Sequence, residues 1–134
     1  MIYLASPYSH PDFRVRERRF QDACRAAAGL LRAGVAVFSP IAHSHPIASC
    51  GVSTSWDFWS QVDREFLSRC DMLAVLTLPG WRESVGVQAE IKLAIDLHLP
   101  VVFVEPADLD EEEREPPTIY ELLQLQACAE KQAA

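Results

Sequence analysis

Apolar residues fall into short continuous runs that alternate with longer amphipathic stretches. The runs predict buried strands over residues 2–5, 35–38, 72–78 and 101–104. Between and after them, apolar positions recur near helical spacing and predict helices over residues 12–33, 56–69, 84–97 and 119–130. The alternation indicates βαβ units with right-handed crossovers. The predicted fold class is therefore α/β: a single doubly wound, flavodoxin- or Rossmann-like parallel sheet of four to five strands, with helices on both faces.

One stretch has no regular pattern. Residues 40–55 are rich in His, Ser, Pro and Gly, and we expect an irregular loop there. Such a long loop in a compact domain usually has a function. In open parallel sheets the ligand crevice lies at the carboxyl ends of the strands. This rule groups residues 6–8, 39–45 and 79–90 around one site.

Length and charge limit the function classes. The chain has 134 residues, of which 49% are hydrophobic, and we expect one domain over residues 1–134. The net charge of −7 argues against a nucleic acid or an anionic membrane as partner. Residues 108–115 hold six acids and one arginine, so most of this charge belongs to one predicted loop. The remainder is compatible with a small anionic ligand.

Cysteine usage and hydropathy favour a reducing compartment. The four cysteines show no CxxC or zinc-type spacing, so free thiols are expected. The first residues lack the basic region of a signal peptide, and no apolar run approaches the ~20 residues of a membrane span. We therefore predict a cytoplasmic protein.

The segment from Leu78 to Glu90 carries the strongest chemical signal. Ser84 is suited to cap a helix, whose first N–H groups can bind an anion. Gly86 leaves space where a ligand would approach, and Glu90 lies four residues later on the same helical face. We expect the helix dipole to help keep Glu90 ionised. The alternative is an ordinary strand–loop–helix junction with a surface glutamate.

Asp63 is a second carboxylate of interest, on a helix that is otherwise rich in apolar residues. It is either a surface residue or a partner for a polar ligand. Two carboxylates in one crevice are suited to cleaving a glycosidic bond. One stabilises or attacks the anomeric carbon, and the other handles the proton of the leaving group.

Aromatic and histidine residues add weaker signals. Tyr3, Tyr8, Trp56, Trp59 and Trp81 could offer faces to a base, although core packing explains most of them equally well. His43 and His45 lack a third metal ligand at suitable spacing, so we interpret them as hydrogen-bonding groups of the site loop. No Walker A loop, GxGxxG fingerprint or GxSxG elbow is present. Neither a metal nor a cofactor is expected.

Three motifs together resemble the nucleoside 2-deoxyribosyltransferase-like superfamily. They are Tyr3-Leu4-Ala5-Ser6-Pro7-Tyr8, the pair Asp63…Asp71, and Ser84-x-Gly86-x-x-x-Glu90. The resemblance extends from residue 2 to about residue 104 and is nearest to an uncharacterised bacterial branch. The third motif is also similar to that of 2′-deoxynucleoside 5′-phosphate N-hydrolases and CMP N-glycosidases.

The resemblance implies roles for individual residues. Glu90 matches the catalytic glutamate that attacks or stabilises C1′, and Asp63 matches the aspartate that protonates or orients the base. Ser84 stands where the N-hydrolases place a serine that binds the 5′-phosphate, whereas the transferases have an aspartate there. The predicted substrate-binding residues are Ser6, Pro7, Tyr8, Arg19, His43, Trp81, Ser84 and Gly86.

Two motifs differ from the related enzymes. The Gly-Ser-x-Arg loop of the deoxynucleotide hydrolases is Ser6-Pro7-Tyr8-Ser9 in this chain, which leaves ribose and deoxyribose both open. The glycine of Glu-x-Gly-x-Ala is replaced by Lys92.

The sequence supports three hypotheses. The first is an N-glycosidase that splits a nucleoside 5′-monophosphate into free base and (deoxy)ribose 5-phosphate. The second is a nucleoside 2-deoxyribosyltransferase, and the third is a non-catalytic nucleotide-binding or sensing module. The partner is in each case a small nucleotide or nucleoside, and the resemblance implies a homodimer or higher homo-oligomer.

Overall fold

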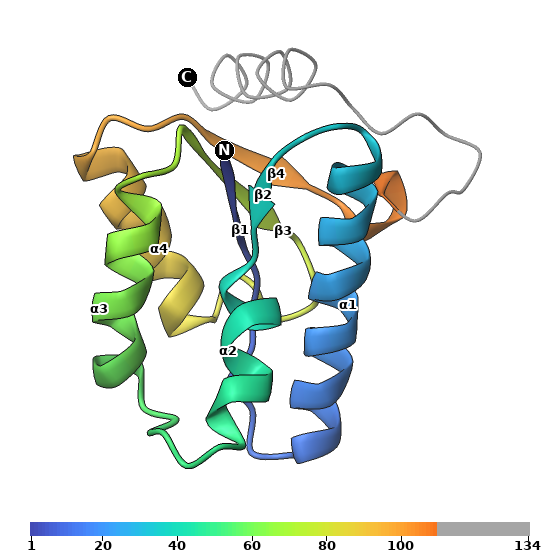
Figure 1. The fold of residues 1–134 in the computed structure, drawn as a ribbon, viewed down its shortest axis with the longest axis vertical. Coiled ribbons are helices and arrows are strands. Elements are labelled where there is room, and N and C mark those ends of the chain that lie inside the picture. The colour runs from blue at the N-terminus through green and yellow to red at the C-terminus, as the bar shows by residue number, and fades with distance from the viewer. Residues whose placement is uncertain (110–134) are drawn as a thin grey trace.

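The structure is a computed structural model and describes residues 1–109. Strands and helices alternate along this part of the chain, as the hydrophobic pattern predicts (Figure 1). The elements are β1 (Ile2–Ala5), α1 (Phe13–Arg32), β2 (Val37–Phe38), α2 (Pro40–Ala48), α3 (Trp56–Leu67), β3 (Met72–Leu76), α4 (Val85–Asp96) and β4 (Val101–Val104), followed by a 3₁₀ turn at Pro106–Asp108.

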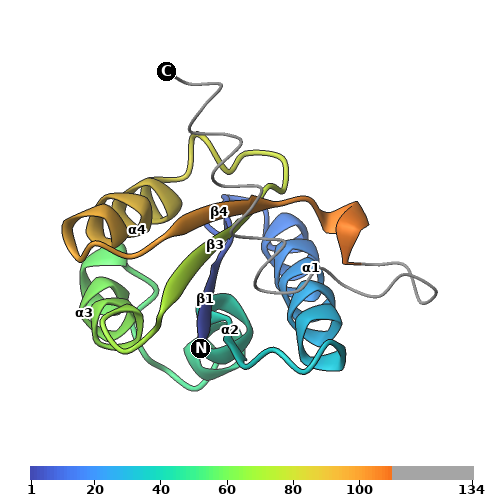
Figure 2. The same ribbon diagram turned by 90° about the horizontal axis from the view of Figure 1, so that it is seen from above.

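The four strands form one parallel sheet in the order β2-β1-β3-β4. Ile2 pairs with Val37 on one side and with Met72 on the other, so β1 lies at the centre of the sheet. Helix α1 covers one face, and α3 and α4 cover the other (Figure 2). The predicted doubly wound α/β fold is confirmed. Since the chain leaves β1 in opposite directions to reach β2 and β3, the crevice expected for such sheets lies between the ends of β1 and β3.

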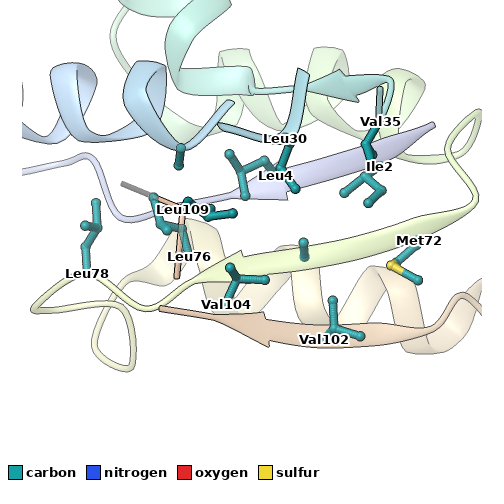
Figure 3. Close-up of a cluster of buried hydrophobic side chains, with 12 residues drawn as sticks. Ile2, Leu4, Leu30, Val35, Met72, Leu76, Leu78, Val102, Val104 and Leu109 are labelled. Atoms are coloured by element: carbon teal, nitrogen blue, oxygen red, sulfur yellow. The ribbon is translucent and has the colours of Figure 1, made fainter. Parts of the chain in front are cut away.

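Alternate residues of the strands face two separate hydrophobic clusters. On the side of α1, Ile2 and Leu4 of β1 pack with Leu30 and with apolar residues of β3 and β4 (Figure 3). On the side of α3 and α4, Tyr3 and Ala5 pack with the other cluster, which contains Leu67 and Val87. All five residues of β3 are buried, as its unbroken apolar run predicts.

The helix boundaries follow from local sequence signals. Asp12, Ser55 and Ser84 cap α1, α3 and α4, and each accepts a hydrogen bond from a backbone N–H of the first turn. Gly34 has a φ of 76° immediately after α1. This left-handed conformation, which glycine adopts without strain, ends the helix close to the predicted boundary at residue 33.

Helix α2 contradicts the prediction of an irregular loop over residues 40–55. Ser39 caps this helix by accepting from the N–H of Ala42, and Pro40 occupies its first position. Proline is favoured there because the first N–H of a helix has no intrahelical partner. The Ser39-Pro40 pair thus starts a helix. Only residues 49–55 remain without regular structure.

The predicted helix over residues 119–130 and most of the acidic segment 108–115 lie outside the described residues. Within residues 1–109, no helix has the length and apolarity needed to cross a membrane. Three of the cysteines fall in the described part, Cys24, Cys50 and Cys70, and all three are free thiols.

Candidate active site

A cavity of about 370 Å³ opens at the carboxyl ends of β1 and β3. Its wall is built from the loop after β1, the loop after β3, the segment before α3, and parts of α1, α2, α3 and α4. Most of the predicted site residues line it, namely Ser6, Tyr8, Arg19, Asp63, Ser84, Gly86 and Glu90. The sheet therefore brings together residues that are far apart in the sequence.

Glu90 is the most deeply placed charged residue of the cavity. It lies in the second turn of α4 with only 6% of its surface exposed, and its Oε2 has no hydrogen-bond partner. Burial raises the pKa of Glu90 to about 8, and the nearby charge of Asp63 acts in the same direction. The expectation that the helix dipole keeps Glu90 ionised is wrong. The dipole weakens beyond the first turn, whereas desolvation acts on the whole carboxylate.

Tyr3 lies beside Glu90 on the same face of the sheet. Its hydroxyl is buried without a hydrogen-bond partner, although it is close enough to Glu90 to lower the pKa of that carboxyl and partly oppose the effect of burial. Burial and the Glu90 charge raise the pKa of Tyr3, so its hydroxyl stays protonated. The sequence left Tyr3 open between an aromatic face for a base and core packing. The structure places its ring in the second hydrophobic cluster and its hydroxyl near the Glu90 carboxyl.

Asp63 approaches the cavity from α3 and is half-buried. Burial raises its pKa to about 6, and no group of residues 1–109 forms an ion pair or a hydrogen bond with it. Because burial raises the pKa of Asp63 to about 6 and that of Glu90 to about 8, the two carboxyls together hold one proton at neutral pH, and it lies on Glu90. Asp71, the other aspartate of the predicted pair, lies away from the cavity and forms an ion pair with the N-terminal amine.

The start of α4 supplies hydrogen-bond donors. Ser84 Oγ accepts from the N–H of Val87 at 3.2 Å, so its own O–H remains available to donate. The N–H groups of Val85 and Gly86 have no partner within residues 1–109. Across the cavity, the buried Ser6 Oγ also lacks a partner. These donors suit an anion or the hydroxyl groups of a polar ligand.

Gly86 has a more limited role than the sequence indicated. A Cβ at this position would lie 3.5 Å from the ring of Trp56 and 3.8 Å from Glu90 Oε1, which are ordinary contact distances. An alanine therefore fits, but its methyl group fills the gap between the tryptophan ring and the carboxylate.

Arg19 ties two loops of the cavity together. Its Nη1 donates to the carbonyl oxygens of Ser9 at 2.9 Å and Tyr8 at 3.4 Å, and its Nη2 donates to that of Pro79 at 3.3 Å. Gly80 has a φ of 93°, and a Cβ there would lie 2.7 Å from Arg19 Nη2. Arg19 thus brings a positive charge to the wall while holding the backbone, and Glu83 brings a carboxylate to the same wall.

One of the three tryptophans, Trp81, differs from the prediction. Trp56 and Trp59 line the cavity, and the indole N–H of Trp59 donates to the Ser53 carbonyl at 2.7 Å. Trp81 does not line it, because its ring packs on the second hydrophobic cluster and lies 5.2 Å from that of Phe103. The prediction of Trp81 as a binding residue is therefore not supported by its position. The helical spacing of Trp56, Trp59 and Asp63 was the signal for the correct pair.

The two histidines lie on different sides of α2. The ring of His43 packs at 5.6 Å from those of Phe38 and Phe66, outside the cavity lining. In His45 both ring nitrogens are hydrogen-bonded, to Tyr8 and to Glu17. Pro7 is buried behind its neighbours and does not line the cavity either. Within residues 1–109, His, Cys, Asp and Glu side chains form no group of three that could hold a metal ion.

Comparisons with known proteins agree with this fold. A family model described as "Domain of unknown function (DUF1937)" matches residues 1–106. Among solved structures, a 2-deoxyribosyltransferase from the psychrotolerant bacterium Bacillus psychrosaccharolyticus matches with a TM-score of 0.58 and 25% sequence identity. The match covers 78% of this chain and 72% of the other. Curated protein sequences gave no match. The chain belongs to the DUF1937 family, within the nucleoside 2-deoxyribosyltransferase-like superfamily.

Proposed function

We propose that the protein is an N-glycosidase that hydrolyses a nucleoside 5′-monophosphate to free base and (deoxy)ribose 5-phosphate. The observation that carries this proposal is the placement of Glu90, a buried carboxyl with an unpaired oxygen, in one cavity with the half-buried Asp63. Two carboxyl groups of different pKa in one crevice are the equipment for glycosidic cleavage. The likeness to a 2-deoxyribosyltransferase supports the same bond as the target.

The shared proton explains how the pair would act. As the bond between C1′ and the base nitrogen lengthens, positive charge develops on the sugar and favours the ionised form of Glu90. The proton of Glu90 passes to Asp63, and Asp63 gives it to the departing base. Water then adds to C1′, either directly or after Glu90 has formed a glycosyl ester, and its second proton restores the starting state. The net reaction consumes one water molecule.

A 5′-phosphate fits the donors at the start of α4. The Ser84 hydroxyl and the N–H groups of Val85 and Gly86 are directed donors, and the positive end of the helix dipole favours an anion. Arg19 adds a positive charge to the same cavity. A free nucleoside would leave these donors without a charged partner, which is why we propose the phosphorylated substrate.

A panel of ribo- and deoxyribonucleoside 5′-monophosphates, run beside the matching nucleosides, tests the proposal. Free base is separated and quantified by chromatography. We expect base release from at least one monophosphate and slower release from its nucleoside. Equal release from the monophosphate and its nucleoside would contradict the proposal that Ser84 binds a 5′-phosphate. Saturable binding without any release of base would indicate a non-catalytic nucleotide-binding module.

Transfer of the sugar to another base is the second candidate, because the matched structure is that of a 2-deoxyribosyltransferase. A glycosyl ester on Glu90 would serve both outcomes, depending on whether water or a base accepts the sugar. Addition of a second base to the assay separates them. A new nucleoside or nucleotide product would establish transfer.

A further inference from the structure

A chain of three hydrogen-bonded side chains leads from the cavity wall to the surface. The Tyr8 hydroxyl lies 2.6 Å from His45 Nδ1, and His45 Nε2 lies 2.7 Å from Glu17 Oε2. Tyr8 lines the cavity, whereas the His45 side chain is 12% exposed and that of Glu17 is 41% exposed. The three residues come from the loop after β1, from α2 and from α1. We call Tyr8, His45 and Glu17 the relay. None of the catalytic steps proposed above uses it.

The geometry fixes most of the protons in the relay. Glu17 is a carboxylate that can only accept, and the hydrogen bond from His45 holds its pKa below the usual range. His45 Nε2 must therefore carry a proton. Burial raises the pKa of Tyr8, which keeps its phenol protonated. The Tyr8 oxygen is thus fixed against His45 Nδ1. Because a phenol both donates and accepts, this oxygen can form a further hydrogen bond, and since Tyr8 lines the cavity a bound ligand can supply the partner. Arg16 also lies close enough to lower the pKa of Tyr8.

Packing holds the relay in place. The Phe20 ring of α1 stacks on that of His45, with centroids 4.3 Å apart and planes inclined by 27°. The Tyr8 ring meets the His45 ring edge-on at 5.5 Å. Arg19 fixes the backbone on the other side of Tyr8 through the carbonyls of Tyr8 and Ser9. The loop after β1 is therefore held both at its backbone and at the Tyr8 hydroxyl.

We infer that Glu17 and His45 are positioning residues, which hold the Tyr8 hydroxyl at the cavity wall as a hydrogen-bonding group for a hydroxyl, amino or carbonyl group of the bound nucleotide. This inference rests on the proposed function, because the proposed function identifies a nucleotide as the ligand of the cavity. It distinguishes His45 from an ordinary packing residue by one property. Any effect of His45 on ligand binding or on kcat/KM must act through the hydrogen bond to the Tyr8 hydroxyl.

A double-mutant cycle tests this property. The variants are Tyr8→Phe, His45→Phe and the double variant, with kcat/KM measured on the monophosphate that releases base fastest. A single neutral hydrogen bond corresponds to about a 3- to 10-fold loss. We expect each single variant to lose this much and the double variant to lose no more than either. Losses that multiply would show that His45 acts through packing alone and would overturn the inference.

Two further variants keep the test sharp. In His45→Asn a side-chain amide replaces the imidazole near the Nδ1 position, so part of the loss should be restored relative to His45→Phe. Glu17→Gln should lower kcat/KM only where Tyr8 is present. Asp22→Asn, on the same helix and paired with Arg25, serves as the control and should change nothing. Thermal unfolding of every variant checks that the folded fraction is equal.

A spectroscopic measurement separates failure of this inference from failure of the proposed function. Long-range ¹H–¹⁵N NMR of the ¹⁵N-histidine protein reports which ring nitrogens carry protons. We expect a protonated Nε2 in His45 and a changed Nδ1 shift in Tyr8→Phe. A bare Nε2 would overturn the relay whatever the activity. If the intact protein releases no base, the proposed function fails, and the cycle is repeated on the dissociation constants of the same monophosphates, where additive losses again overturn the positioning role.

Discussion

The two faces of the sheet are built from alternate residues of the same strands, yet they differ in whether they contain buried polar atoms that lack a hydrogen bond. On the α1 face, Ile2 and Leu4 lie in a cluster made only of apolar side chains. On the α3–α4 face, Tyr3 lies beside Glu90, and both have a buried polar atom without a partner. Together with Ser6 Oγ, these are the buried side-chain atoms of residues 1–109 that lack a hydrogen bond.

Such atoms are costly. An unsatisfied buried polar group costs about 1–3 kcal/mol, and a buried carboxyl pays a further penalty for ionising. Glu90 and Ser6 line the cavity, and Tyr3 lies against Glu90, so the cost is concentrated at one place in the fold. The comparison indicates that both faces supply stability through buried apolar residues, whereas only the α3–α4 face also gives up some stability to hold groups ready for a ligand.

The largest stability effect should come from the apolar face. Leu30 is fully buried on α1, and Leu30→Ala should lower the free energy of unfolding by about 2–5 kcal/mol because it leaves a cavity. Glu90→Gln, of the same size, should change it by less than about 1 kcal/mol when unfolding is measured below pH 4.5, where the Glu90 carboxyl is protonated in both the folded and the unfolded protein. Urea unfolding of both variants measures the contrast. A Glu90→Gln variant as unstable as Leu30→Ala would remove the distinction between the faces.

The second effect is the dependence of stability on pH. The pKa of Glu90 is about 8 in the folded protein against an ordinary value of 4.5, so the folded state binds this proton more tightly. Its contribution is complete below pH 4.5 and is lost as the pH rises to 8, at about 1.4 kcal/mol for each pKa unit. Unfolding curves between pH 4.5 and 8.5 should therefore show stability falling in the natural protein relative to Glu90→Gln. Parallel curves would mean that Glu90 is not desolvated.

A third effect concerns the shared proton. We expect kcat/KM to follow a bell-shaped pH profile with limbs near 6 and 8, the pKa values of Asp63 and Glu90. Asp63→Asn should lower kcat/KM by about 100-fold and remove the lower limb. Its upper limb should move to lower pH, because a like charge near Glu90 is lost. Asp57→Asn, an exposed acid in the first turn of the same helix, is the matched control and should keep both limbs.

The smallest expected effect is a gain in the stability of the fold. Gly86→Ala places a methyl group at contact distance from Trp56 and Glu90 and should stabilise the fold by about 0.5 kcal/mol through helix propensity. The same methyl group fills part of the cavity, so kcat/KM should fall while the thermal midpoint rises. Gln88→Ala, an exposed change on the same helix, should leave kcat/KM unchanged. If Gly86→Ala were equally active, the space above Gly86 would not belong to the site.

Local patterns were sufficient to predict the strands and three of the helices. The unbroken apolar run of β3 and the capping residues Ser84 and Gly34 act over a few residues and do not depend on distant contacts. Helix α2 was missed because Ser39-Pro40 can either stop a strand or start a helix. The tertiary environment decides between these, and here the helix packs against α1 and β1.

The strand-end rule predicted that Ser6 and the segment that holds Glu90 meet at one cavity, and the family resemblance, rather than the sheet, added Asp63 to them. The site was not predicted correctly for side chains that could pack either into the hydrophobic core or against the cavity. Trp81 packs against the second hydrophobic cluster, whereas Trp56 lines the cavity. The ionisation of Glu90 was also beyond sequence reasoning, since desolvation depends on the packing of α3 and β1 around it rather than on its place in α4.

The most direct test of the central claim compares base release by the natural protein and by Glu90→Gln on the same panel of nucleoside 5′-monophosphates. The amide keeps the size of the side chain but cannot attack or stabilise the sugar cation. We expect the natural protein to release base from at least one monophosphate and Glu90→Gln to be slower by about 1,000-fold, with the fold intact by circular dichroism. Equal rates in the two proteins would contradict the assignment of this cavity as the place where the glycosidic bond is broken.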